Sequence, residues 1–137
     1  MKPLNPKIHG VIDYLFAAFV LLSPSLFGFT GTTAASICYV VGSLHIVLSL
    51  VTAYPMGVFR YIPFPVHGAI ELAAGIFLIA TPWLFGYAAD DTVRNLFLGS
   101  GIAVALVYAL TNYNAAIGIR RYTGITEVES EKRKRAA

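Results

Sequence analysis

The sequence predicts an all-α fold, a four-helix transmembrane bundle built from two parallel two-helix repeats, with both termini in the cytoplasm. Three observations lead to this prediction. The 137-residue chain is 57% hydrophobic and only 12% charged. Four long apolar segments alternate with turns rich in proline and glycine. A pattern of polar residues in the first apolar segment recurs 58 positions later, in the third.

The composition excludes an ordinary soluble domain. Soluble domains carry about 25% charged residues, because their surfaces must be solvated by water. This chain has a mean hydropathy of +0.70, and its length corresponds to one domain. Between positions 8 and 118 only six residues are charged: Asp13, Arg60, Glu71, Asp90, Asp91 and Arg94.

Each apolar segment is long enough, or nearly so, to cross a bilayer, which takes about 20 residues of helix. The expected helices run from about Ile8 to Ser23 and on toward Phe29, from Thr33 to Ala53, from Val66 to Ala80 and on toward Tyr87, and from Thr92 to Asn112. Proline inside a helix removes a backbone donor and clashes one turn back. We therefore expect the first and third helices to kink or end near Pro24 and Pro82.

Basic residues set the predicted orientation. Nine of the ten lie in the N-terminus, the middle connection or the tail, and only Arg94 lies in an outer turn. Because cytoplasmic loops are enriched in Lys and Arg, we predict that both ends of this multi-pass chain lie in the cytoplasm. Residues 1–118 are the predicted membrane domain (repeat 1 about 7–56, repeat 2 about 65–114), and 119–137 a polar cytoplasmic tail. Aromatic side chains are expected at the inner interface (Tyr54, Tyr61, Tyr113) and the outer one (Trp83, Tyr87).

The internal repeat preserves polar residues as well as apolar length. Over positions 9–29 and 67–87, eight of 21 residues are identical. The aligned features are His9-Gly10 with His67-Gly68, Asp13 with Glu71, and Pro24 with Pro82. In the second helices, Gly42-Ser43 matches Gly99-Ser100 if one residue is dropped from the outer loop. Each unit crosses the membrane twice, so the copies are predicted to be parallel, with a pseudo-two-fold axis along the membrane normal.

The proline motifs carry a family resemblance. One copy reads Ser23-Pro24-Ser25 and the other Thr81-Pro82-Trp83, each followed by Leu-Phe-Gly and an aromatic residue. Over about residues 7–113 the chain resembles the SPW-repeat family of small bacterial membrane proteins. The resemblance implies a four-helix, multi-pass protein of the bacterial cytoplasmic (inner) membrane and no established activity. We interpret the motif residues as structural, ending the helix and shaping the turn: Pro24, Gly28, Pro82, Trp83 and Gly86.

Two His/carboxylate pairs are the candidate site. His9 and Asp13, like His67 and Glu71, are spaced i, i+4 and therefore share a helix face. Ionisable groups in a membrane usually face the bundle interior. The pairs would then converge near the axis, with four uses open: structural pairing, a proton or ion path, a zinc, iron or manganese site, and haem ligation by the two histidines.

His45 lies near the middle of the second predicted helix and has no counterpart in the fourth, where positions 102 and 103 hold Ile and Ala. A neutral histidine, bonded across helices, is the favoured interpretation. For the whole cluster structural pairing is favoured, and no metal or cofactor is assigned.

On function, the signatures of common enzymes are absent from the sequence: there is no G-x-S-x-G, phosphate-binding glycine loop or H-E-x-x-H. Cys38 is the only cysteine, which excludes an intramolecular disulfide. We predict a non-enzymatic structural or accessory protein, or a subunit of a membrane complex. Its expected partners are lipids and either further copies of itself or other membrane proteins, and not nucleic acid. The alternative is a small transporter, channel or ion-binding protein that uses the repeated pairs.

Overall fold

The computed structural model describes residues 2–114, 131–132 and 134–135. Within them the elements are α1 (Pro6–Leu26), α2 (Thr33–Val51), β1 (Thr52–Ala53), β2 (Ile62–Pro63), α3 (Phe64–Leu84) and α4 (Asp91–Leu110). All four helices are long and apolar enough to cross a membrane, which confirms the predicted all-α bundle. The predicted tail, 119–137, lies mostly outside the described residues.

The prolines stand in the last turn of α1 and α3. α1 continues two residues beyond Pro24 and α3 two residues beyond Pro82. Each helix is then followed by a glycine with positive φ, Gly28 at 73° and Gly86 at 75°, which a residue with a side chain adopts only under strain. The helix therefore ends where the sequence predicts, and the glycine allows the chain to turn back.

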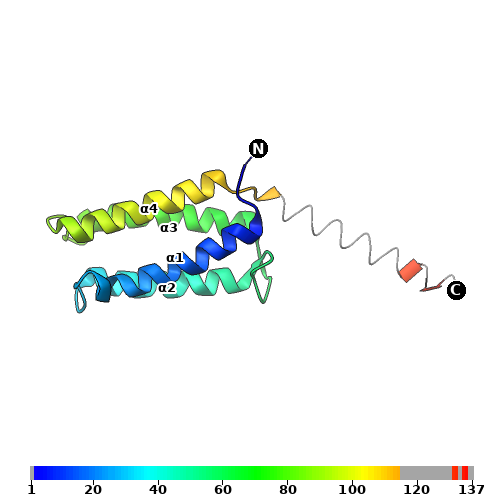
Figure 1. The fold of residues 1–137 in the computed structure, drawn as a ribbon, viewed down its shortest axis with the longest axis horizontal. Helices are drawn as coiled ribbons and strands as arrows, with labels where there is room; N and C mark the ends of the chain where they lie inside the picture. Colours follow the sequence, from blue (N-terminus) through cyan, green and yellow to red (C-terminus); the bar gives the residue numbers. More distant parts are fainter. Residues whose placement is uncertain (1, 115–130, 133, 136–137) are drawn as a thin grey trace.

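The bundle is formed by two helical hairpins. α1 packs mainly on α2 and α3 mainly on α4, and Figure 1 shows the two hairpins side by side. We call the end where α1 and α3 begin the terminal end, and the end with the two short turns the turn end. The side chains of Asn5, Thr32 and Asp90 each accept a hydrogen bond from the backbone at the start of a helix, as N-caps do.

Short strand pairings join the hairpins at the terminal end. β1 pairs in parallel with β2, Thr52 opposite Ile62. An isolated parallel bridge joins Leu4, ahead of α1, to Thr111, just after α4. The chain entering each hairpin is thus bonded to the chain leaving the other, and the same arrangement occurs in both copies.

The register of the second helices differs from the sequence alignment. A Cβ on Gly42 would lie 3.3 Å from the carbonyl oxygen of Ala17, and one on Gly101 would lie against the carbonyl oxygen of Gly75, whereas Gly99 has open space around it. Ala17 and Gly75 are themselves 58 positions apart. Gly42 is therefore equivalent to Gly101, and not to Gly99 as the alignment indicated.

The bundle interior changes in character along its length. Toward the turn end it is an apolar core that includes Val20, Cys38, Leu78 and Phe97. Toward the terminal end the buried side chains are mostly polar, and they include all three histidines. Buried polar groups need partners, because an unpaired one is costly in an apolar medium, so this end is where a functional site is to be sought.

Candidate cation-binding centre

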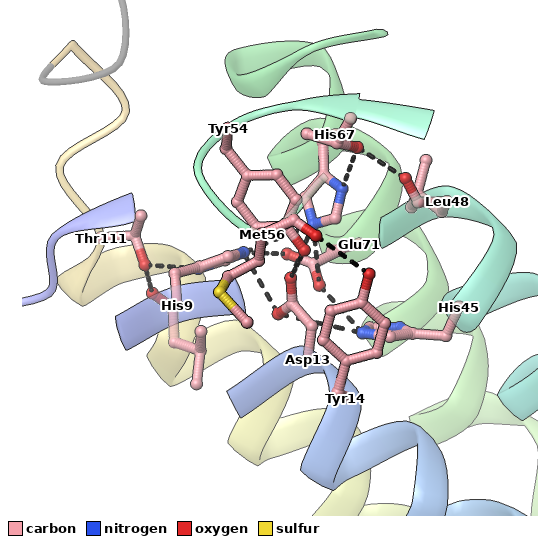
Figure 2. Close-up of polar contacts among 12 residues, drawn as sticks. His9, Asp13, Tyr14, His45, Leu48, Tyr54, Met56, His67, Glu71 and Thr111 are labelled. Carbon is pink, nitrogen blue, oxygen red and sulfur yellow. Dashed lines mark hydrogen bonds and ion pairs between the residues drawn. The ribbon is translucent and has the colours of Figure 1, made fainter. Parts of the chain in front are cut away.

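The two His/carboxylate pairs meet at one point inside the terminal end. The Nε2 atoms of His9 and His67 lie 3.4 Å apart. Both histidines are 0% exposed, Asp13 is 2% and Glu71 is 3% exposed. Figure 2 shows their side chains turned toward one another from α1 and α3. The structure thus brings together the four residues that the sequence pattern singled out.

Each histidine contacts both carboxylates. His9 Nε2 lies 3.3 Å from Asp13 Oδ1 and 3.1 Å from Glu71 Oε2. His67 Nε2 lies 3.4 Å from Asp13 Oδ2 and 3.2 Å from Glu71 Oε1. One contact of each histidine is within its own helix and the other is to the opposite repeat. The centre therefore belongs to both repeats together.

The Thr111 hydroxyl fixes the orientation of His9. The Thr111 hydroxyl donates to the Val107 carbonyl at 2.6 Å, which uses its only proton. Toward His9 Nδ1, 2.8 Å away, the Thr111 oxygen can then only accept. Nδ1 of His9 must carry the proton, so Nε2 of a neutral ring presents a lone pair to the centre.

The other copy repeats this arrangement. The Thr52 hydroxyl donates to the Leu48 carbonyl at 2.6 Å and lies 2.7 Å from His67 Nδ1. Sequence reasoning missed both threonines. A signal existed, since Thr52 and Thr111 each begin a Thr-x-Tyr sequence after the second helix of a repeat.

The centre is closed at the terminal end by aromatic rings. Phe64, 1% exposed, has its ring centroid 5.3 Å from that of Tyr54 and 4.7 Å from that of Tyr113. The Tyr54 hydroxyl donates to Asp13 Oδ2 at 3.1 Å. Tyr54 is 3% exposed, so the expectation that it lies at the membrane interface is wrong: its hydroxyl is drawn inward to the carboxylate. Burial, followed by the charge of Asp13, raises the pKa of Tyr54, which keeps its hydroxyl a donor.

The glycine after each histidine makes room for this aromatic cover. A Cβ on Gly10 would lie 2.6 Å from the Tyr54 ring, and one on Gly68 would meet the Tyr113 ring. The repeated His-Gly-x-x-Asp/Glu pattern therefore combines a ligand-type pair with the space that its cover requires.

His45 joins the cluster from α2. Its Nε2 lies 3.2 Å from Glu71 Oε1 and 3.9 Å from Asp13 Oδ1, yet it has no hydrogen-bond partner of good geometry within the described residues. With the register set by Gly42 and Gly101, its counterpart in α4 is Val104, rather than position 102 or 103. The asymmetry leaves a pocket of about 50 Å³ between α1 and α4, lined by Ile12, Asp13, Phe16, His45, Glu71, Ala103, Val104 and Val107.

The arrangement requires protons or a cation between its acceptor atoms. Two neutral imidazoles would turn Nε2 lone pairs toward each other and toward carboxylate oxygens, which are all acceptors. Isolated carboxylates are also strongly unfavourable in a membrane interior. Two protons shared among the Nε2 atoms and the carboxylate oxygens, or one divalent cation, would bring the centre to neutrality. Haem does not fit between His9 and His67, because both carboxylates lie within 3.4 Å of the Nε2 atoms, where the macrocycle would have to pass.

The proline motifs lie away from this centre. The hydroxyls of Ser23 and Thr81 donate to the carbonyls of Phe19 and Leu78 at 2.7 and 2.8 Å. Trp83 is 60% exposed. The motif residues Pro24, Pro82, Gly28 and Gly86 sit at the turn end of their helices, where they shape the hairpin turns.

The comparisons with known proteins agree with this architecture. The sequence model of the SPW repeat domain matches residues 7–112. No curated protein matches the chain, and no solved structure matches it.

Proposed function

The chain belongs to the SPW repeat family, and we propose that this small multi-pass membrane protein is a non-enzymatic protein that binds a cation at the centre formed by His9, Asp13, His67 and Glu71. The proposal departs from the purely structural role favoured by the sequence, and takes up the ion-binding alternative. Its setting is the bacterial cytoplasmic (inner) membrane with both termini inside, which the distribution of Lys and Arg supports.

One observation carries the proposal: the two carboxylates and two inward-turned Nε2 atoms meet in a buried space. A pairing that only held the helices together would be satisfied by one hydrogen bond per histidine. Here two imidazoles and two carboxylates, supplied equally by the two repeats, lie within 4.8 Å of one another through one ligand-type atom each. Such a group of acceptors is stabilised when a cation occupies it.

Binding is better supported than conduction. The pocket beside the centre, about 50 Å³, can hold water, but its walls beyond His45 and the carboxylates are apolar. Phe64 and Tyr54 cover the centre at the terminal end. A transporter would have to move this cover during each cycle, whereas a stably bound cation requires no such movement.

The exposed helix faces suit an accessory protein in lipid. Large apolar side chains such as Leu15, Leu44 and Ile76 are more than half exposed, as is expected where lipid is the solvent. We include in the proposal an assembly with further copies or with other membrane proteins, and no role with nucleic acid.

The test uses the full chain, purified in detergent without a polyhistidine tag and treated with a chelator. The melting temperature is recorded with Na⁺, K⁺, Mg²⁺, Ca²⁺, Mn²⁺, Co²⁺ and Zn²⁺ in turn. A ligand that binds only the folded state raises that temperature. We expect at least one cation to raise it for the natural chain and not for the variant D13N/E71Q. If no cation raises it, cation binding is wrong.

A further inference from the structure

We propose that the cation is a divalent transition-metal ion of the zinc type, bound in a tetrahedron by Nε2 of His9, Nε2 of His67 and one oxygen each of Asp13 and Glu71. This inference rests on the proposed cation binding and specifies the ligand. The distances, the donor atoms, the orientation of the histidines and the buried His45 support this assignment.

The four residues lie close enough together for a tetrahedral site. Ligands about 2.0–2.1 Å from a zinc ion at the corners of a tetrahedron lie about 3.3–3.4 Å from one another. The two Nε2 atoms lie 3.4 Å apart, and each lies 3.1–3.4 Å from one oxygen of Asp13 and one of Glu71. The oxygens differ, since His9 contacts Asp13 Oδ1 and Glu71 Oε2 whereas His67 contacts Oδ2 and Oε1. With one ligand atom from each residue the four atoms lie within 4.8 Å of one another, so a bound ion would draw the two carboxylates inward by rotation of their side chains.

The donor atoms select the class of metal. Imidazole nitrogen suits zinc, copper, iron and nickel, whereas calcium and magnesium take oxygen ligands. Half of this set is nitrogen, so the alkaline-earth ions are disfavoured. Two carboxylates and two neutral imidazoles carry a charge of −2, and a divalent ion brings the buried centre to neutrality.

The surroundings orient the ligands as in a metal site. Histidines that bind metals almost always donate their second ring N–H to a carboxylate, carbonyl or water, which fixes tautomer and ring direction. Thr111 and Thr52 accept that bond from His9 and His67 at 2.8 and 2.7 Å. The identity of the free nitrogen is thus fixed before any ion arrives.

His45 supplies an independent indication of a ligand. Its Nε2 is buried, lacks a hydrogen-bond partner of good geometry, and lies 3.2 Å from Glu71 Oε1 on the side of the pocket. A buried nitrogen of this kind is unfavourable unless something binds it. A bound ion, or a water held by the ion in the pocket, places a partner within its reach.

The experiment loads the chelator-treated chain with Co²⁺, which reports tetrahedral coordination by strong visible absorption, and separately with Zn²⁺ for metal analysis. We expect roughly one ion per chain, as for a closed four-ligand site. The variant H9Q/H67Q should lose both the absorption and the ion. Cys38→Ala is the control: it removes the only thiol, which lies in the apolar core, and the variant should keep both the absorption and the bound ion.

The outcomes separate the two proposals. Stabilisation by Mg²⁺, Ca²⁺ or Na⁺, without cobalt absorption or bound zinc, overturns the metal class and leaves cation binding standing. A folded natural chain that no cation stabilises overturns both. If a folded H9Q/H67Q variant keeps the cobalt spectrum, the proposed ligand set is wrong. If that variant does not fold, the cobalt spectrum of D13N is compared with that of the natural chain, and an unchanged spectrum overturns the ligand set.

Discussion

His9 and His67 face each other with their Nε2 atoms 3.4 Å apart, although 58 positions separate them in the chain. The two residues are equivalents in the internal repeat, so the contact brings the same residue of both copies to one point. Each repeat supplies one of the two facing histidines and one carboxylate. The threonine of each Thr-x-Tyr sequence contacts the histidine of the other repeat, so a single repeat would leave that threonine without its partner. The duplication therefore completes the centre as well as the bundle.

Glu71→Gln should destabilise the protein strongly. The change removes one charge from a buried cluster and leaves the others uncompensated, which costs about 3–5 kcal/mol in buried ion pairs. The melting temperature in detergent measures the effect. Asp91→Asn is the matched control, because the Asp91–Arg94 pair is at the surface, with Asp91 78% exposed, and such pairs contribute about 0–1 kcal/mol. Similar losses in both variants would contradict the burial argument.

The glycines beside the histidines should tolerate no side chain. Gly10→Ala and Gly68→Ala each place a Cβ against a tyrosine ring that covers the centre, so we expect a fall in melting temperature and weaker cation binding. Gly99→Ala also adds one methyl group to a helical glycine, but into open space. It should raise stability by up to about 1 kcal/mol, the helix-propensity difference. Equal behaviour of all three variants would rule out the packing explanation.

The threonines should tune affinity without forming the site. The double variant T52V/T111V keeps the shape of both side chains and removes the hydroxyl oxygens that accept from the histidines. Loss of such orienting partners typically weakens metal binding about 10–100-fold. Titration with Zn²⁺ against a competing chelator measures the change, and Thr92→Val, on the exposed start of α4, serves as control. Unchanged affinity in T52V/T111V would show that the hydroxyls do not orient the ligands.

The helices and four residues of the centre could be predicted from the sequence, because bilayer thickness limits helix length and the repeat marks equivalent positions. Hydropathy and proline positions placed the four helices to within a few residues, and the i, i+4 pairs identified four members of the centre. Thr111 could not be placed in the same way, since its partner His9 is 102 positions away and the bridge between Leu4 and Thr111 is visible only in the folded chain.

The register of α2 and α4 was wrong for a related reason. Alignment paired Gly42 with Gly99 by residue type, whereas packing pairs it with Gly101, the glycine that lies against α3. Residue identity in an alignment does not show which glycine faces a neighbouring helix. The error also hid Val104 as the counterpart of His45, and with it the origin of the pocket.

The proposed orientation can be tested by cysteine labelling in intact cells. In a Cys38→Ala background, a cysteine at Ala89, in the exposed turn between α3 and α4, should react with a membrane-impermeant maleimide. A cysteine at Val58, which is 64% exposed at the terminal end, should react only after the membrane is opened, because the basic end is expected in the cytoplasm. The reverse pattern of labelling would invert the topology.

Tyr87→Phe should stabilise the protein, most of all at alkaline pH. The Tyr87 hydroxyl is buried against the core and lacks a hydrogen-bond partner within the described residues, and the equivalent residue of the first repeat is Phe29. Removing an unsatisfied buried hydroxyl should therefore be neutral or favourable at pH 7. Burial raises the pKa of Tyr87, against a smaller opposing effect of the nearby Thr81 hydroxyl. A group with a raised folded-state pKa contributes stability that is intact below its unfolded pKa and is lost as pH rises above that value. The melting temperature should thus fall further between pH 7 and pH 11 for the natural chain than for the variant. Tyr61→Phe, at a 79% exposed position, is the control. An equal alkaline loss in Tyr87→Phe would show that the hydroxyl is not the group responsible.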